Sequence, residues 1–205
     1  MVAPQETHPG SRAGSPPRVY EDAVRSMRAA SLRPEVHCED MPAPQRIAPF
    51  AAALSADVTV DEEDLGTGRL ILMHDPAGNE AWQGTFRCVC YVRAEVDPEL
   101  INDPMLADVG WSWLTEALAA HGAAYDCEAG TVTSVTTKGF GQMAEDEGTA
   151  QVEIRASWSP LPDEDGVVDM APHTEAWGEL LCTTVGLPPV PEGVTAIPSR
   201  RGQRG

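Results

Sequence analysis

The chain has 205 residues, of which 42 % are apolar and 22 % are charged, a composition typical of a folded domain. Its 32 acidic and 14 basic residues give a formal net charge of −18, which disfavours nucleic acid and anionic membranes as partners. No stretch reaches the roughly 20 apolar residues of a membrane-spanning helix. The N-terminal residues lack the apolar core of a signal peptide, so we expect a cytoplasmic protein.

The two ends differ in composition from the middle of the chain. Residues 1–18 contain four prolines, and residues 188–205 contain four prolines and three arginines, without apolar periodicity. Such segments bury little surface. We therefore predict flexible tails over 1–17 and 188–205, and a single domain over 18–187.

The predicted domain begins with a helix over 18–32, where apolar side chains recur at helical spacing before Pro34. Residues 47–56 form an apolar run that we interpret as a short helix or turn, with a short strand allowed after it. The acidic cluster at 61–64 predicts a solvated loop.

Two hairpins are predicted further along. Branched and aromatic residues over 68–75 and 84–96 indicate one pair of strands, joined by a turn that contains Pro76 and Gly78. Threonine- and valine-rich runs over 127–141 and 149–158 indicate the second pair.

A helix is predicted after each hairpin. The stripe that includes Met105, Leu114 and Leu118 indicates the first of them, and residues 173–186 indicate the second. The sequence therefore predicts an α+β fold, with an antiparallel sheet of two hairpins in ββα-ββα order, helices packed on it and an N-terminal helix.

The five cysteines give no sign of a metal site or disulfide framework. They are odd in number, lack CxxC spacing and occur without an export signal. Cys88 and Cys90 share one face of a predicted strand and are interpreted as core side chains, with a metal or redox role as the alternative. We predict no metal and no cofactor.

No catalytic motif is present. The chain lacks GxSxG, a phosphate-binding GxxxxGK[ST] loop and a strand-linked GxGxxG, so we assign no catalytic residue. One constellation is consistent with an enzyme: His74, Asp75 and Glu80 flank the first predicted turn and carry acid-base groups, and Arg93 could hold an anionic substrate. The structural interpretation is that turns collect such residues for backbone reasons.

Two further residue types bear on binding. Arg93 and Arg155 are expected to pair with carboxylates, with capture of an anionic ligand as the alternative. Tryptophans make up five of eleven aromatic residues. Trp113 and Trp177 fall on helical apolar stripes and are predicted core residues, whereas Trp82 and Trp111 are candidates for partner contacts.

Several stretches of the sequence together resemble one uncharacterised bacterial family, domain of unknown function 3000. They are RPEVHCEDMPAPQRIAPFA, TGRLILMHDPAGNEAWQGTFRCVCYVRAEVDPEL, VGWSWLTEALAAHGA, VEIRASWSPL and EAWGELLCTTVGLPPV, which span roughly residues 20–198. The resemblance implies a single cytoplasmic domain. It implies no catalytic residue.

The leading hypothesis from the sequence is a non-enzymatic protein-binding or adaptor module. The acidic charge, the missing catalytic motifs and the candidate exposed tryptophans motivate it. The candidate binding residues are His74, Asp75, Glu80, Trp82, Arg93 and Trp111. Its partner is expected to be another protein, and a homodimer is allowed. The alternative is a small-molecule enzyme that uses His74, Asp75 or Glu80 for acid-base work and Arg93 for an anionic substrate.

Overall fold

The computed structural model describes residues 15–97, 103–143 and 148–189. In chain order its helices and strands are α1 (Arg18–Ala29), β1 (Val36–Met41), β2 (Phe50–Val60), β3 (Glu63–Asn79), η1 (Glu80–Trp82), β4 (Gly84–Glu95), α2 (Leu106–Ala120), β5 (Tyr125–Thr137), η3 (Gly141–Met143), β6 (Thr149–Pro160) and α3 (Ala171–Thr184).

The six strands form one antiparallel sheet in the order β1-β2-β3-β4-β6-β5. Strands β1 to β4 are sequential neighbours, as expected where short turns join antiparallel strands. The chain then crosses through α2 to the far edge, forms β5, and returns as β6 between β4 and β5. Because β4 and β5 are both antiparallel to β6, they run parallel to each other.

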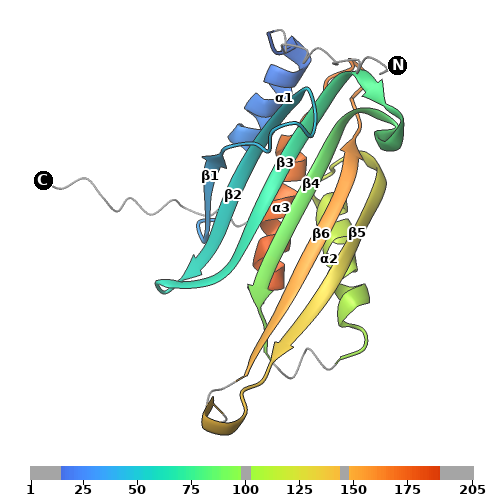
Figure 1. The fold of residues 1–205 in the computed structure, drawn as a ribbon. Helices are drawn as coiled ribbons and strands as arrows, with labels where there is room; N and C mark the ends of the chain where they lie inside the picture. Colours follow the sequence, from blue (N-terminus) through green and yellow to red (C-terminus); the bar gives the residue numbers. More distant parts are fainter. Residues whose placement is uncertain (1–14, 98–102, 144–147, 190–205) are drawn as a thin grey trace, which may run out of the picture.

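The helices lie on one face of this sheet, and the opposite face is open (Figure 1). The core between helices and sheet contains Leu70 and Leu72 of β3, Ile154 and Trp158 of β6, and Trp177 of α3. All five side chains are almost completely buried. Helix α2 packs against α3 and β5, and α3 reaches β3 and β4.

Helix α3 lies close to the sheet because β3 carries glycine where the two meet. A Cβ atom built on Gly68 would lie 2.8 Å from Cδ2 of Leu181 and 3.0 Å from the carbonyl oxygen of Tyr91. A Cβ atom on Gly66 would lie 2.6 Å from Cγ1 of Val185. Side chains at these positions would separate the helix from the strand.

The predicted fold class is confirmed, with the N-terminal helix, both hairpins and the helix after each. Two local predictions are wrong. Residues 47–56 are not a helix, because β2 starts at Phe50, and the sheet has β1 and β2 in addition to the two predicted hairpins. The acidic cluster is exposed as expected, although Glu63 and Asp64 already belong to β3.

The prediction for the cysteines of β4 is confirmed, since Cys88 and Cys90 are buried on the helix-covered face. Burial raises the pKa of Cys90 to about 12 and that of Cys88 well above its ordinary value. Trp177 is fully buried as predicted. Trp113 is only half-buried, packed against the edge of the core.

Candidate functional site

His74 lies on the helix-covered side of β3 and is 2 % exposed. Its ring stacks on Phe86 at 4.2 Å between centroids and also faces Tyr20 and Phe50. Nδ1 lies 3.0 Å from the carbonyl oxygen of Thr85, and burial lowers the pKa of the imidazole. Among the described residues, the buried Nε2 has no hydrogen-bond partner. His74 is therefore part of an aromatic cluster beneath α1.

The two carboxylates near His74 have separate surroundings. Asp75 accepts a hydrogen bond from the backbone nitrogen of Ala77 at 3.0 Å, which stabilises the β3–β4 turn. Glu80 is exposed in η1. Arg93 stands near the opposite end of β4, where it pairs with Thr67, whereas His74 pairs with Phe86. The structure does not bring His74 and Arg93 together in one site.

The two candidate tryptophans are half-buried and lie apart from each other. Trp82 belongs to η1, and its carbonyl oxygen accepts a hydrogen bond from Ser159 Oγ at 2.6 Å. Trp111 of α2 packs over β5, because a Cβ atom on Gly130 would lie 2.6 Å from its Cζ3. Neither indole is an exposed anchor.

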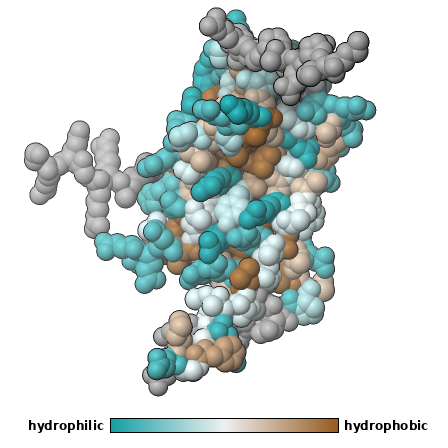
Figure 2. All heavy atoms as spheres, in the orientation of Figure 1, coloured by the Kyte–Doolittle hydropathy of each residue, from teal (hydrophilic) through white to brown (hydrophobic). Residues whose placement is uncertain are grey.

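The open face of the sheet carries a different set of residues, which alternate with the buried ones. Four of the chain's 14 basic residues stand on this face of β3, β4 and β6: Arg69, Arg87, Arg93 and Arg155. Figure 2 shows this side, where hydrophobic patches lie among hydrophilic side chains. The same face also carries carboxylates, among them Asp57, Glu95 and Glu153, so its charge is mixed.

Strand register aligns three of these side chains in a row across the sheet. Arg69 of β3 is opposite Tyr91 of β4, and Tyr91 is opposite Arg155 of β6. Neighbouring strands are about 4.8 Å apart, so the two arginine backbones stand roughly 10 Å apart with the tyrosine between them. We call Arg69, Tyr91 and Arg155 the arginine–tyrosine row.

The two arginines of the row differ in their contacts with other described residues. The Arg155 guanidinium carbon lies 5.3 Å from the centre of the Tyr91 ring, and Nη2 lies 3.0 Å from Oε2 of Glu153. The Tyr91 hydroxyl donates to Oε1 of Glu153 at 3.1 Å. Hydrogen bonds from Arg155 and Tyr91 lower the pKa of Glu153. Within the described residues Arg69 is exposed and makes no hydrogen bond or ion pair.

The neighbouring row of the open face is uncharged and mostly apolar. Ala53, Ile71, Val89, Ser157 and Ala129 stand opposite one another across five strands. A hollow of about 430 Å³ lies where this row meets the arginine–tyrosine row, lined by Arg69, Ile71, Val89, Cys90, Tyr91 and Arg155. The site thus combines an apolar floor with cationic and aromatic walls.

Arg87 stabilises one end of this face from within. It is 8 % exposed, and its guanidinium donates to four oxygens: Cys127 O at 2.7 Å, Ser159 Oγ at 3.1 Å, Ser157 O at 3.3 Å and Ser157 Oγ at 2.7 Å. A buried charge requires such partners. Arg87 therefore ties β4 to β6 and to the bulged start of β5.

The expectation for the two singled-out arginines is met in one case. Arg155 pairs with the carboxylate of Glu153, whereas Nε of Arg93 donates to the amide oxygen of Gln151 at 3.1 Å. Arg69, Ile71, Val89 and Tyr91 were not predicted as site residues. Alternation in GRLILMHD and TFRCVCYVRAEV could have identified them, because they lie between the residues predicted to be buried.

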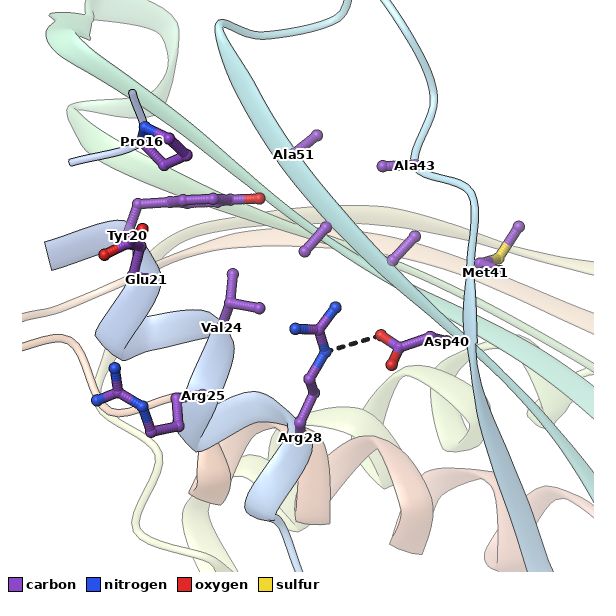
Figure 3. A pocket seen from close by; sticks show the side chains of 12 residues that line it. Pro16, Tyr20, Glu21, Val24, Arg25, Arg28, Asp40, Met41, Ala43 and Ala51 are labelled. Atoms are coloured by element: carbon purple, nitrogen blue, oxygen red, sulfur yellow. Dashed lines mark hydrogen bonds and ion pairs between the residues drawn. The ribbon is translucent and has the colours of Figure 1, made fainter. Parts of the chain in front are cut away.

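A second cavity of about 700 Å³ lies between α1 and strands β1 and β2 (Figure 3). Tyr20 and Arg28 project into it from α1, and Nε of Arg28 lies 2.8 Å from Oδ1 of Asp40. Arg25 is likewise paired with Asp22 at 2.6 Å. Because Arg25 and Arg28 are already paired with carboxylates, this groove has less to offer an anionic ligand than the open face.

Within residues 15–97, 103–143 and 148–189, no helix has both the length and the hydropathy needed to cross a bilayer. Over the same residues, no group of three or more His, Cys, Asp and Glu side chains is arranged to hold a metal ion.

Comparison with known proteins gives one result. No curated protein and no solved structure matches the chain. The sequence model of one family, described as protein of unknown function (DUF3000), matches residues 16–195. This match spans α1 to α3 and therefore the whole sheet with its arginine–tyrosine row. The chain belongs to the DUF3000 family.

Proposed function

We propose that the chain is a non-enzymatic, cytoplasmic protein-binding module whose open sheet face binds an acidic, partly apolar segment of another protein. The observation that carries this proposal is the arginine–tyrosine row beside the apolar hollow. The hollow can bury apolar side chains, and Arg69, which has no ion pair within the described residues, supplies a charge that an anionic partner would neutralise.

The spacing of the row suggests the pattern of the bound segment. An extended chain rises about 3.4 Å per residue and turns alternate side chains to one face, so carboxylates four residues apart share a face at roughly 14 Å. The long side chains of Arg69 and Arg155, whose backbones are roughly 10 Å apart, can reach both carboxylates. The apolar residue midway between the carboxylates shares their face and would lie over Tyr91, beside the hollow. The preferred ligand is therefore an extended segment with a repeating Glu-x-apolar-x-Glu pattern.

The small-molecule enzyme remains a weaker hypothesis for a geometric reason. It requires His74, Glu80 and Arg93 to converge, whereas His74 is buried on the helix-covered face and Arg93 projects from the open one. The open face offers a shallow apolar and cationic surface, which suits a polypeptide.

The test is a binding titration with defined peptides on the full chain. A fluorescein-labelled peptide with the Glu-Ser-Leu-Ser repeat, which puts Glu and Leu on one face, is compared by fluorescence anisotropy with peptides that carry Gln or Lys in place of Glu. We expect binding of the acidic peptide only, weakened by added salt. Arg69→Ala should lower the affinity about tenfold, which is about 1.4 kcal/mol.

Arg18→Ala is the matched control, because Arg18 has a 92 % exposed side chain on α1, away from the open face. It should leave the affinity unchanged. Equal binding of the three peptides, or equal effects of the two substitutions, would overturn the proposal. A single-stranded RNA oligonucleotide is included, and its binding in preference to the acidic peptide would also overturn it.

A further inference from the structure

The two edges of the sheet differ in how they are protected. Strand β1 at one edge has six residues, and it carries Glu39 and Asp40, the latter paired with Arg28 of α1. Strand β5 at the other edge has 13 residues. Short length and charge are what usually prevent an edge strand from pairing with another chain. Only the β1 edge has both.

The β5 edge is regular and uncharged over Ala129–Thr137. These nine residues pair with β6 without interruption, from Ala129 opposite Ser157 to Thr137 opposite Thr149. They contain no charged residue and no proline, and six of them are β-branched: Thr131, Val132, Thr133, Val135, Thr136 and Thr137. Within the described residues, β6 is the one strand that pairs with β5, so its other edge is unpaired.

We infer that this edge is the homodimer interface of the protein, with β5 of two copies paired antiparallel to form one twelve-stranded sheet. The net charge of −18 favours the β5 edge as the place where two copies of the chain meet. Two identical acidic chains repel each other wherever their charged surfaces meet, and the Ala129–Thr137 edge is a stretch of about 30 Å where they would not.

The flanking charges are self-complementary in this arrangement. The register that pairs the full Ala129–Thr137 edge with itself places Thr133 on the twofold axis. Glu128, in the bulge just before the edge, then comes near Lys138 of the second copy, and the same pair repeats at the other end. Lys138 is the one lysine of the chain. Opposite charges across an antiparallel pair are stabilising, and like charges are destabilising.

The dimer would also join the two open faces. Thr131 is opposite Arg155 and therefore on the open side of β5. A twofold axis perpendicular to the sheet keeps both open faces on the same side, so two arginine–tyrosine rows would lie on one continuous surface. The dimer inference does not depend on what that surface binds.

The test is the association state of the full chain by sedimentation equilibrium. We expect a concentration-dependent dimer for the wild type. Thr133→Glu and Thr133→Lys, each alone, place like charges on the twofold axis and should weaken the dimer at least tenfold, whereas an equimolar mixture of the two should form a heterodimer. His37→Glu, an exposed position on the β1 edge, is the control that should leave the dimer intact.

Exchanging the charges of Glu128 and Lys138 tests how the two β5 strands are aligned in the dimer. Lys138→Glu should weaken the dimer, and Glu128→Lys combined with it should restore the association. A dimer unaffected by the Thr133 variants would overturn the inference, and so would a double exchange that fails to restore it. A monomeric wild type would overturn it as well: protection of the β5 amides from hydrogen exchange would then assign the edge to another segment of the same chain.

Discussion

His173 should make the fold sensitive to mild acid. It lies in the first turn of α3, is 2 % exposed, and accepts a hydrogen bond at Nδ1 from Nε1 of Trp158 at 3.1 Å. Burial lowers the pKa of this imidazole to about 4, partly opposed by Asp169. The folded protein therefore holds His173 neutral at a pH where the unfolded chain protonates it.

The size of the effect follows from the difference between the two pKa values. The ordinary value is 6.5, so the contribution of neutral His173 is complete above that pH and is lost as the pH falls toward 4. Between pH about 7.5 and about 5, one such group removes about 2 kcal/mol from the free energy of unfolding. His74, whose pKa is also lowered by burial, acts in the same direction.

The measurement is urea unfolding, followed by tryptophan fluorescence, at several pH values within this window. Carboxylates with lowered pKa, such as Glu35 and Glu153, lose their contribution only below pH about 4.5, so the window isolates the histidines. His173→Asn is the informative variant, because its side-chain oxygen can accept the Trp158 hydrogen bond and it does not titrate.

We expect the variant to be less stable at neutral pH and to show a flatter dependence on pH. The difference in free energy of unfolding between wild type and variant should shrink by about 2 kcal/mol from pH about 7.5 to about 5. If the two proteins keep a constant difference over this range, then burial does not hold His173 neutral and the reasoning fails.

Three further predictions concern packing and burial. Gly68→Ala should lower the free energy of unfolding by about 2 kcal/mol, because α3 must move away from β3. Gly84→Ala is the control: its new Cβ would meet no atom closer than 3.9 Å, so the free energy of unfolding should change by less than about 0.5 kcal/mol. Equal urea midpoints for the two variants would contradict the close approach of α3 to Gly68. Cys88 and Cys90 should react with an aromatic disulfide reagent only at the rate of global unfolding, and modification that is fast in native buffer would show that they are accessible. Arg87→Met should cost about 3 kcal/mol in thermal unfolding because four oxygens lose their donor, and an unchanged midpoint would show that these hydrogen bonds contribute nothing net.

The elements that the sequence predicted are those with a strong local pattern. The two hairpins and the helices after them follow from alternation or helical spacing within one segment. The helix prediction for residues 47–56 was wrong because this segment is rich in alanine, which favours helix. Its small side chains also give no clear alternation of apolar and polar residues, although β2 pairs with strands on both sides. Strand β1 was missed because, on this edge, only Val36 is deeply buried, and the strand also contains the polar residues His37, Glu39 and Asp40.

The candidate site could not be predicted in the same way. Arg69, Tyr91 and Arg155 come from three separated segments, and only the register of β3, β4 and β6 puts them side by side. The sequence pointed to His74 and Arg93 because they flank one hairpin. Alternation then places His74 and Arg93 on opposite faces of the same sheet.

The position of β6 in the middle of the sheet has a consequence for the order of folding. Strands β1 to β4 can form by successive local hairpins. Strand β4 then pairs with β6, in which Gln151, the partner of Glu95, lies 56 residues later in the chain. Closing so long a loop costs entropy before any contact repays it, so we expect this pairing late and refolding in the slow range of mixed α/β domains. During synthesis, the apolar side of β3 stays uncovered until α3 has emerged, and the nascent chain is most prone to aggregation over that interval.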